Sequence, residues 1–120
     1  METVANVLVG LVAALHLYIL VMEMFLWQRA QGRKFHGFDP EMARATAAMA
    51  ANQGLYNGFL AAGLVWGLIA ADPTGFRAQV FFLSCVIVAG VYGAATANRR
   101  ILIAQALPGA IALAAVLVAR

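Results

Sequence analysis

Charged residues are scarce in this chain of 120 residues. Asp, Glu, Lys and Arg together make up 11% of it, whereas 64% of the residues are hydrophobic. Soluble domains carry about 25% charged residues, and a soluble chain of this size buries only about two thirds of the surface that its unfolded form exposes. The composition therefore excludes an ordinary soluble domain and predicts that lipid covers much of the surface.

Cysteine and histidine are also few, with one Cys and two His. The single Cys85 excludes a disulfide within one chain, and no His/Cys cluster has the spacing of metal ligands. The sequence contains no catalytic or phosphate-binding motif, so we predict no metal site and leave the cofactor unassigned. The eight cations lie at the ends of apolar stretches, which favours contact with lipid headgroups and argues against nucleic acid as a partner.

Long apolar runs are what the chain has in abundance. They cover Val4–Trp27, Ala45–Ala71, Ala78–Ala97 and Ile101–Ala119, and a helix needs roughly 20 apolar residues to cross a bilayer. Short polar connections make successive helices antiparallel neighbours. We therefore predict an all-α fold, an integral membrane antiparallel four-helix bundle in which residues 1–120 form a single four-span transmembrane domain in contact with the lipid bilayer.

The cations are divided unevenly between the two sides of such a bundle. The side with more Lys and Arg faces the cytoplasm under the positive-inside rule. We therefore expect the first and third connections in the cytoplasm and both termini outside, in the cell (inner) membrane if the source is bacterial. The cytoplasmic cations would be Arg29, Arg33, Lys34, Arg44, Arg99 and Arg100, and the outer ones Arg77 and Arg120.

Helix ends and turns have clear local signals. In Asp39-Pro40-Glu41, Asp39 can cap free N–H groups and Pro40 suits a first helical position, so the second helix should begin near Pro40. The segment Asp72-Pro73-Thr74-Gly75 has the residues of a tight turn. Pro108 removes a backbone donor from the fourth stretch and should kink it.

Polar side chains inside the apolar stretches gather near the cytoplasmic end. Asn52, Gln53, Tyr56 and Asn57 follow an i, i+1, i+4, i+5 pattern, which places them on one stripe of a helix. An unpaired polar group in hydrocarbon costs a few kcal/mol, so the stripe should face other helices or a wet cavity. The candidate ligand-binding residues are His16, Glu23, Asn52, Gln53, Tyr56, Asn57 and Tyr92.

Glu23 and His16 each allow more than one interpretation. A carboxyl group inside the membrane can fix helix register through hydrogen bonds, serve as a ligand, proton or ion site, or reach toward the headgroups. His16 can be a neutral buried side chain, part of a proton relay or a metal ligand. These alternatives stay open at the level of the sequence.

Two glycine pairs lie on the second apolar stretch at a spacing of four, Gly54 with Gly58 and Gly63 with Gly67. Small residues at this spacing allow helices to approach closely in lipid. They indicate either packing within the chain or an interface in a homo-oligomer or a larger membrane complex.

Three segments together resemble a known family. They are His16–Ile19 leading to Glu23–Trp27, then Asn52–Ala61, then Gly90–Ala94. In these the chain is similar, over nearly its whole length, to small four-helix bacterial membrane proteins catalogued as domain of unknown function 1304. The resemblance implies a four-span bacterial membrane protein, and it brings no activity, substrate or catalytic residue.

Three functions stay open. The first is binding or transport of a small molecule at the cytoplasm-facing polar layer, which requires a cavity at Glu23. The second is a structural or accessory subunit of a membrane assembly, for which a closed interior would suffice. The third is an enzyme acting on a lipid-soluble substrate, with Glu23 as general acid or base.

Overall fold

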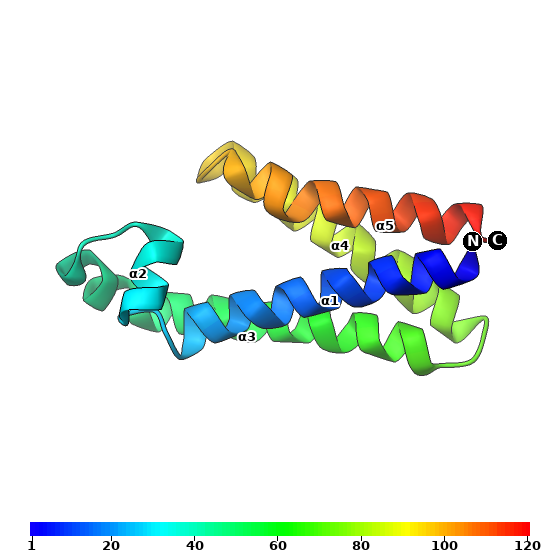
Figure 1. Ribbon diagram of the computed structural model, residues 1–120, viewed down its shortest axis with the longest axis horizontal. Coiled ribbons are helices and arrows are strands. Elements are labelled where there is room, and N and C mark those ends of the chain that lie inside the picture. Colours follow the sequence, from blue (N-terminus) through cyan, green and yellow to red (C-terminus); the bar gives the residue numbers. More distant parts are fainter. The chain divides into compact units, whose positions relative to one another are not determined.

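The computed structural model describes residues 1–120, and all of its regular structure is helical. This confirms the all-α prediction. The elements follow one another along the chain in Figure 1. They are α1 (Glu2–Met24), α2 (Ala30–His36), α3 (Pro40–Ile69), α4 (Thr74–Thr96), a π-helical segment η1 (Leu102–Ala106) and α5 (Leu107–Val118).

The chain forms two compact units. The first contains Met1–Ala14 and Leu60–Arg120, and the second contains Leu15–Phe59. Helices α1 and α3 each supply residues to both units. We predict a single domain from the sequence, and this division into two units does not test that prediction.

The first unit is built around an apolar core from α1, α3, α4 and α5. Val9, Leu64, Leu83, Val86 and Ala112 are fully buried in it. Helix α4 packs along η1 and α5, which Figure 1 shows as the orange-to-red segment that returns beside it. Burial of each of the larger side chains contributes about 1.5–3 kcal/mol to the free energy of unfolding. This core therefore stabilises the first unit.

Glycine and small residues set the distance between α4 and the last two elements. A Cβ atom on Gly90 would lie 2.7 Å from the backbone nitrogen of Ala106, and one on Gly93 would lie 3.1 Å from Cγ2 of Ile101. Backbone cannot move aside as a side-chain end can, so Gly90 is the tighter of the two contacts. The helices therefore approach as closely as their backbones allow at this point.

The start of α3 confirms the local prediction. The helix begins at Pro40, and Asp39 Oδ1 accepts a hydrogen bond of 2.8 Å from the backbone N–H of Met42. This is the expected N-cap contact, which satisfies one of the donors left free at a helix start. Asp72 makes a similar contact at the start of α4, where its Oδ1 accepts from the N–H of Phe76 at 3.2 Å.

The end of the first helix differs from the expectation. The apolar run extends to Trp27, but α1 ends at Met24 because the N–H of Leu26 bonds back to Val21 O. The connection then folds into the short helix α2, which we did not predict from the sequence. Gly32 lies so close to Leu26 that a Cβ would overlap the Leu26 carbonyl, and α2 ends at Gly37 with φ of 76°.

The fourth apolar stretch is helical but not uniformly α. Residues Leu102–Ala106 form the π-helical turn η1, and α5 follows with Pro108 in its first turn. Pro108 lacks the N–H that an α-helix would bond to residue 104, and its ring crowds that carbonyl. The wider π turn before the proline accommodates both effects.

Two helices, α1 and α4, are long and apolar enough to cross a membrane. The segment from Leu102 to Val118 is apolar but shorter. Helix α3 has the length, with 30 residues, but Asn52, Gln53 and Asn57 lower its mean hydropathy. Of the four apolar stretches expected to cross the bilayer, two therefore form helices that are long and apolar enough to do so.

The α4 contact gives a direct test of packing in the first unit. Gly90→Ala should lower the free energy of unfolding by about 1–3 kcal/mol, because the new methyl group meets the backbone of Ala106. Gly10→Ala is the matched control, since a Cβ there meets nothing within 4 Å. It should be neutral or stabilising by up to ~1 kcal/mol, since Ala favours helix more than Gly. Denaturant-induced unfolding in detergent, followed by circular dichroism, measures both, and equal effects of the two changes would contradict the contact.

Candidate functional site

The second unit buries an acidic side chain together with an amide. Glu23, in the last turn of α1, is 6% exposed, and Asn57, near the middle of α3, is 9% exposed. Asn57 Nδ2 donates a hydrogen bond of 2.7 Å to Glu23 Oε1. The structure therefore brings together two of the residues proposed from sequence, which lie 34 positions apart.

Glycines on α3 create the space for this pair. A Cβ on Gly54 would lie 3.0 Å from Glu23 Cβ and 2.7 Å from Met24 Cγ, and a Cβ on Gly58 would lie 2.6 Å from Leu20 Cδ1. Gly54 and Gly58 flank Asn57 on the same helical face. With no side chains at these two positions, α1 comes close enough for the short amide to reach the carboxyl group.

The hydrogen bond engages only one of the two carboxyl oxygens. Every buried side-chain nitrogen and oxygen of the chain has a hydrogen-bond partner, and Asn57 contacts Oε1. Since Oε2 has no such partner, it must keep contact with the surface. Glu23 can therefore still accept a hydrogen bond, or hold or release a proton, while it remains joined to α3.

The rest of the proposed stripe does not share this contact. Asn52, Gln53 and Tyr56 are exposed, and the Tyr56 ring, at 60% exposure, packs edge-on against Phe59. At about 100° per residue, the positions from Asn52 to Asn57 span an arc of roughly 140°. One neighbouring helix cannot cover so wide an arc, and in this structure α1 covers only its Asn57 edge.

The two remaining candidates lie apart from the hydrogen-bonded pair along the chain. His16 is fully buried on α1, two turns before Glu23. Tyr92 is on α4, in the first unit, and is 71% exposed. Neither is joined to Glu23 by the hydrogen bond described here. Their membership in a common site stays a prediction.

A second polar network in this unit was not predicted. Trp27 Nε1 donates to Thr46 Oγ1 at 3.0 Å, and Phe38 N donates to His36 Nδ1 at 2.9 Å. Because Nδ1 accepts, the proton of the neutral ring is on Nε2, which then donates to Trp27 O at 2.7 Å. The aromatic rings of Trp27, His36 and Phe38 stack within 4.2–6.0 Å of one another.

This network ties α1, α2 and α3 together. Two of its residues, His36 and Phe38, lie in the run Arg33-Lys34-Phe35-His36-Gly37-Phe38. The end of α2 at the left-handed Gly37 could have been anticipated, because glycine is common at this position. The long-range contact with Thr46 could not, since nothing local specifies it.

The glycine pairs have neighbours in their own chain. Besides Gly54 and Gly58, a Cβ on Gly63 would overlap the Phe82 ring, and one on Gly67 would lie 2.7 Å from Gln79 Cγ. These contacts agree with the first of the two interpretations of the glycine pairs, which is helix packing within the chain. An oligomer interface through the same glycines stays a prediction.

Nothing in the arrangement points to a metal. No group of three or more His, Cys, Asp or Glu side chains comes together in residues 1–120. The chemistry available at Glu23 is that of a single carboxyl group with an amide partner.

Comparison with known proteins gives the family. Residues 10–117 match the family model described as protein of unknown function DUF1304. The chain belongs to this family. A relative, the uncharacterized protein YpaA of Lactococcus lactis subsp. lactis (strain IL1403), is 26% identical over 106 residues, covering 86% of this chain and 88% of that protein. No solved structure matches.

The pair can be tested by a double-mutant cycle. Asn57→Leu should lower the free energy of unfolding by about 1–3 kcal/mol, because it leaves a buried carboxyl group without its donor. Glu23→Leu should also destabilise, and the double variant should cost less than the sum by about 1 kcal/mol. Reversible unfolding in mixed detergent measures all three.

Asn52→Leu is the control for the loss of an amide on α3, since Asn52 is exposed. It should change stability by less than ~0.5 kcal/mol. Strict additivity of the Glu23 and Asn57 changes would show that the hydrogen bond does not form.

Proposed function

We propose that the chain is an integral membrane protein whose four apolar helical segments cross the bilayer as an antiparallel bundle. In the most apolar windows of α1 and α4, only 28% and 22% of the residues are buried inside the chain. The core helix of a soluble protein would be mostly buried. Large apolar side chains such as Leu11, Ile69 and Phe81 are instead exposed, and acyl chains would remove them from water.

The two weaker segments fit the same arrangement. With 30 residues, α3 is roughly 45 Å long, whereas the hydrocarbon layer is roughly 30 Å thick. Its first turns, with exposed Glu41 and Arg44, would then lie among the headgroups. The Leu102–Val118 segment is near the lower length limit of roughly 17 residues for a span.

We further propose that the protein binds a small molecule at the cytoplasm-facing end of this bundle, with Glu23 as the anchoring group. One observation carries this proposal. Glu23 is almost fully buried and fixed by Asn57, yet its second oxygen has no partner in the chain. A group held rigidly with one free acceptor is suited to a ligand that supplies a hydrogen-bond donor.

Exposed amides on α3 would add specificity to such a site. Gln53 lies one turn before Asn57 and is exposed, so its side chain borders the contact with α1. The exposed Asn52 and Tyr56 continue the polar surface around the helix. Contact of these amide and hydroxyl groups with acyl chains would leave them without hydrogen bonds, which is unfavourable. A polar ligand would supply those hydrogen bonds, and this supports a binding role.

The membrane proposal predicts that the connection containing Lys34 and the connection containing Thr74 are accessible from opposite sides of the membrane. In a Cys85→Ala background, Lys34→Cys should react with a membrane-impermeant maleimide only from the cytoplasmic side. Thr74→Cys should react only from the outside. Right-side-out and inverted membrane vesicles provide the two directions. Labelling of both positions from the same side, or release of the protein by alkaline carbonate, would contradict the arrangement.

The binding proposal predicts that replacing the Glu23 carboxyl group weakens ligand binding without unfolding the chain. Water-soluble amines, amides, alcohols and guanidines can be screened by thermal unfolding of the purified protein in mild detergent. For a compound that stabilises the wild type, Glu23→Gln should weaken the apparent affinity about tenfold, because an NH2 group, which cannot accept a hydrogen bond, replaces the second carboxyl oxygen. Gln can still accept the hydrogen bond from Asn57.

Glu41→Gln is the matched control, because Glu41 is an exposed carboxyl group at the start of α3. It should leave the response unchanged. An equal ligand response in wild type and Glu23→Gln would leave Glu23 with a packing role only, as in a structural or accessory subunit.

A further inference from the structure

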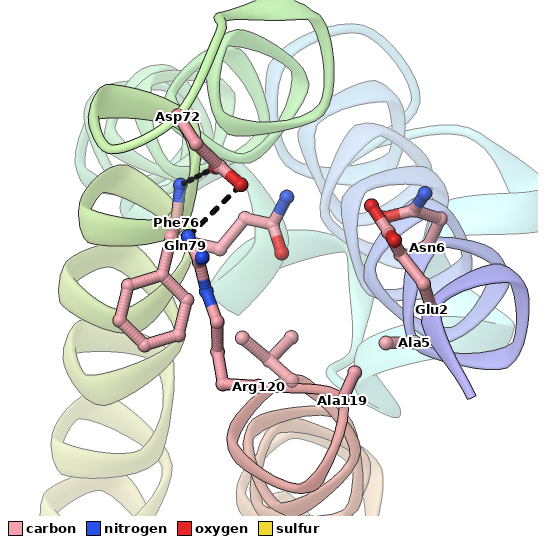
Figure 2. Close-up of a pocket in the computed structure, with 9 residues that line it drawn as sticks. Glu2, Ala5, Asn6, Asp72, Phe76, Gln79, Ala119 and Arg120 are labelled. Atoms are coloured by element: carbon pink, nitrogen blue, oxygen red, sulfur yellow. Dashed lines mark hydrogen bonds and ion pairs between the residues drawn. The ribbon is translucent and has the colours of Figure 1, made fainter.

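An open pocket of about 90 Å³ lies in the first unit, where α1 begins, α4 begins and α5 ends. Figure 2 shows its lining. Residues in these helices and just beyond their ends contribute charged and amide side chains together with a few apolar ones. Its polar lining consists of Glu2, Asn6, Asp72, Gln79 and Arg120.

The strongest donor in the pocket is already occupied. Arg120 forms an ion pair with Asp72, with 3.0 Å between Nη2 and Oδ2, and its guanidinium lies 4.1 Å from the centre of the Phe76 ring. Asp72 also accepts the N–H of Phe76 through Oδ1. Figure 2 shows both contacts of Asp72 as dashed lines. The cation, its counterion and the aromatic face are therefore engaged with one another.

The remaining polar groups are mainly acceptors. Glu2 takes part in no ion pair, and Gln79 uses its amide nitrogen on Gly67 O at 2.8 Å, which leaves its oxygen available. In Figure 2 the Gln79 side chain extends toward the side of the pocket where Asn6 and Glu2 lie. The two carboxylates and one guanidinium of the lining give it a net side-chain charge of −1.

We propose that this pocket binds a primary ammonium group. Such a group carries one positive charge and three N–H donors, which match the free Glu2 carboxylate and the amide oxygens of Asn6 and Gln79. A quaternary ammonium group has no donors and depends on an open aromatic face, and here Arg120 covers the Phe76 ring. The volume admits a group of several non-hydrogen atoms, such as an aminoethyl group.

Two sources could supply this chemistry. One is the headgroup of an ethanolamine phospholipid, because the pocket lies at helix ends, where headgroups meet a membrane protein. The other is a free primary amine. The pocket uses neither Glu23 nor Asn57, so it is independent of the binding site proposed above, whereas its lipid source rests on the proposed membrane arrangement.

The first arm of the test uses ethanolamine as the probe, with tetramethylammonium at equal ionic strength as its comparison. Thermal unfolding of the purified full chain in a non-ionic detergent should show stabilisation by ethanolamine alone. Glu2→Gln should weaken the apparent affinity about tenfold, because a charge-assisted hydrogen bond is lost. Glu41→Gln and Glu23→Gln should leave the response unchanged.

The second arm replaces the free amine with lipid. Nanodiscs of phosphatidylethanolamine are compared with nanodiscs of phosphatidylcholine that have the same acyl chains. Greater stability in phosphatidylethanolamine that is lost in Glu2→Gln assigns the headgroup as the source, whereas a response to free ethanolamine alone assigns a soluble amine. Either result supports the proposal. Equal responses to ethanolamine and tetramethylammonium with no preference between lipids, or a Glu2→Gln variant that behaves as wild type in both arms, would overturn it.

Discussion

The hydrogen bond between Asn57 and Glu23 is the contact on which the second unit depends. A carboxyl group at 6% exposure is unfavourable without a donor, and Asn57 is the donor that the fold supplies. The amide is short, so it reaches only if α1 and α3 nearly touch. Gly54 and Gly58 allow that approach, because a Cβ on Gly54 would lie 3.0 Å from Glu23 Cβ and one on Gly58 would lie 2.6 Å from the end of the Leu20 side chain. The hydrogen bond therefore requires a close approach of α1 and α3, which the two glycines permit.

The local parts of the fold could be predicted from sequence because their causes are local. Asp39 and Pro40 define the start of α3, and the apolar runs locate the helical segments. Glu23 and Asn57 stood out because a carboxyl group and an amide in an apolar run require partners. That they meet each other depends on the positions of Gly54 and Gly58 relative to α1, which spacing alone does not reveal.

Other features could not be predicted because they arise from contacts between distant residues. The stripe from Asn52 to Asn57 has the spacing of one helical face, but its arc is wider than a single neighbouring helix covers. Helix α2 is a seven-residue element, too short to be stable alone, and it exists through the contacts of Gly32, His36 and Trp27. The pocket at Glu2 and Arg120 joins residues from the two ends of the chain.

The π turn η1 determines which side chains of the last apolar segment point at α4. Ile101 and Ala106 contact Gly93 and Gly90, respectively, although they are five residues apart. In a regular α-helix two such positions would be separated by about 140° around the axis, so one of them would point away. The wider turn brings both into phase with the same partner. The segment thus keeps a continuous seam along α4 up to Pro108, and a strictly α-helical version of it would have to give up one end of that seam.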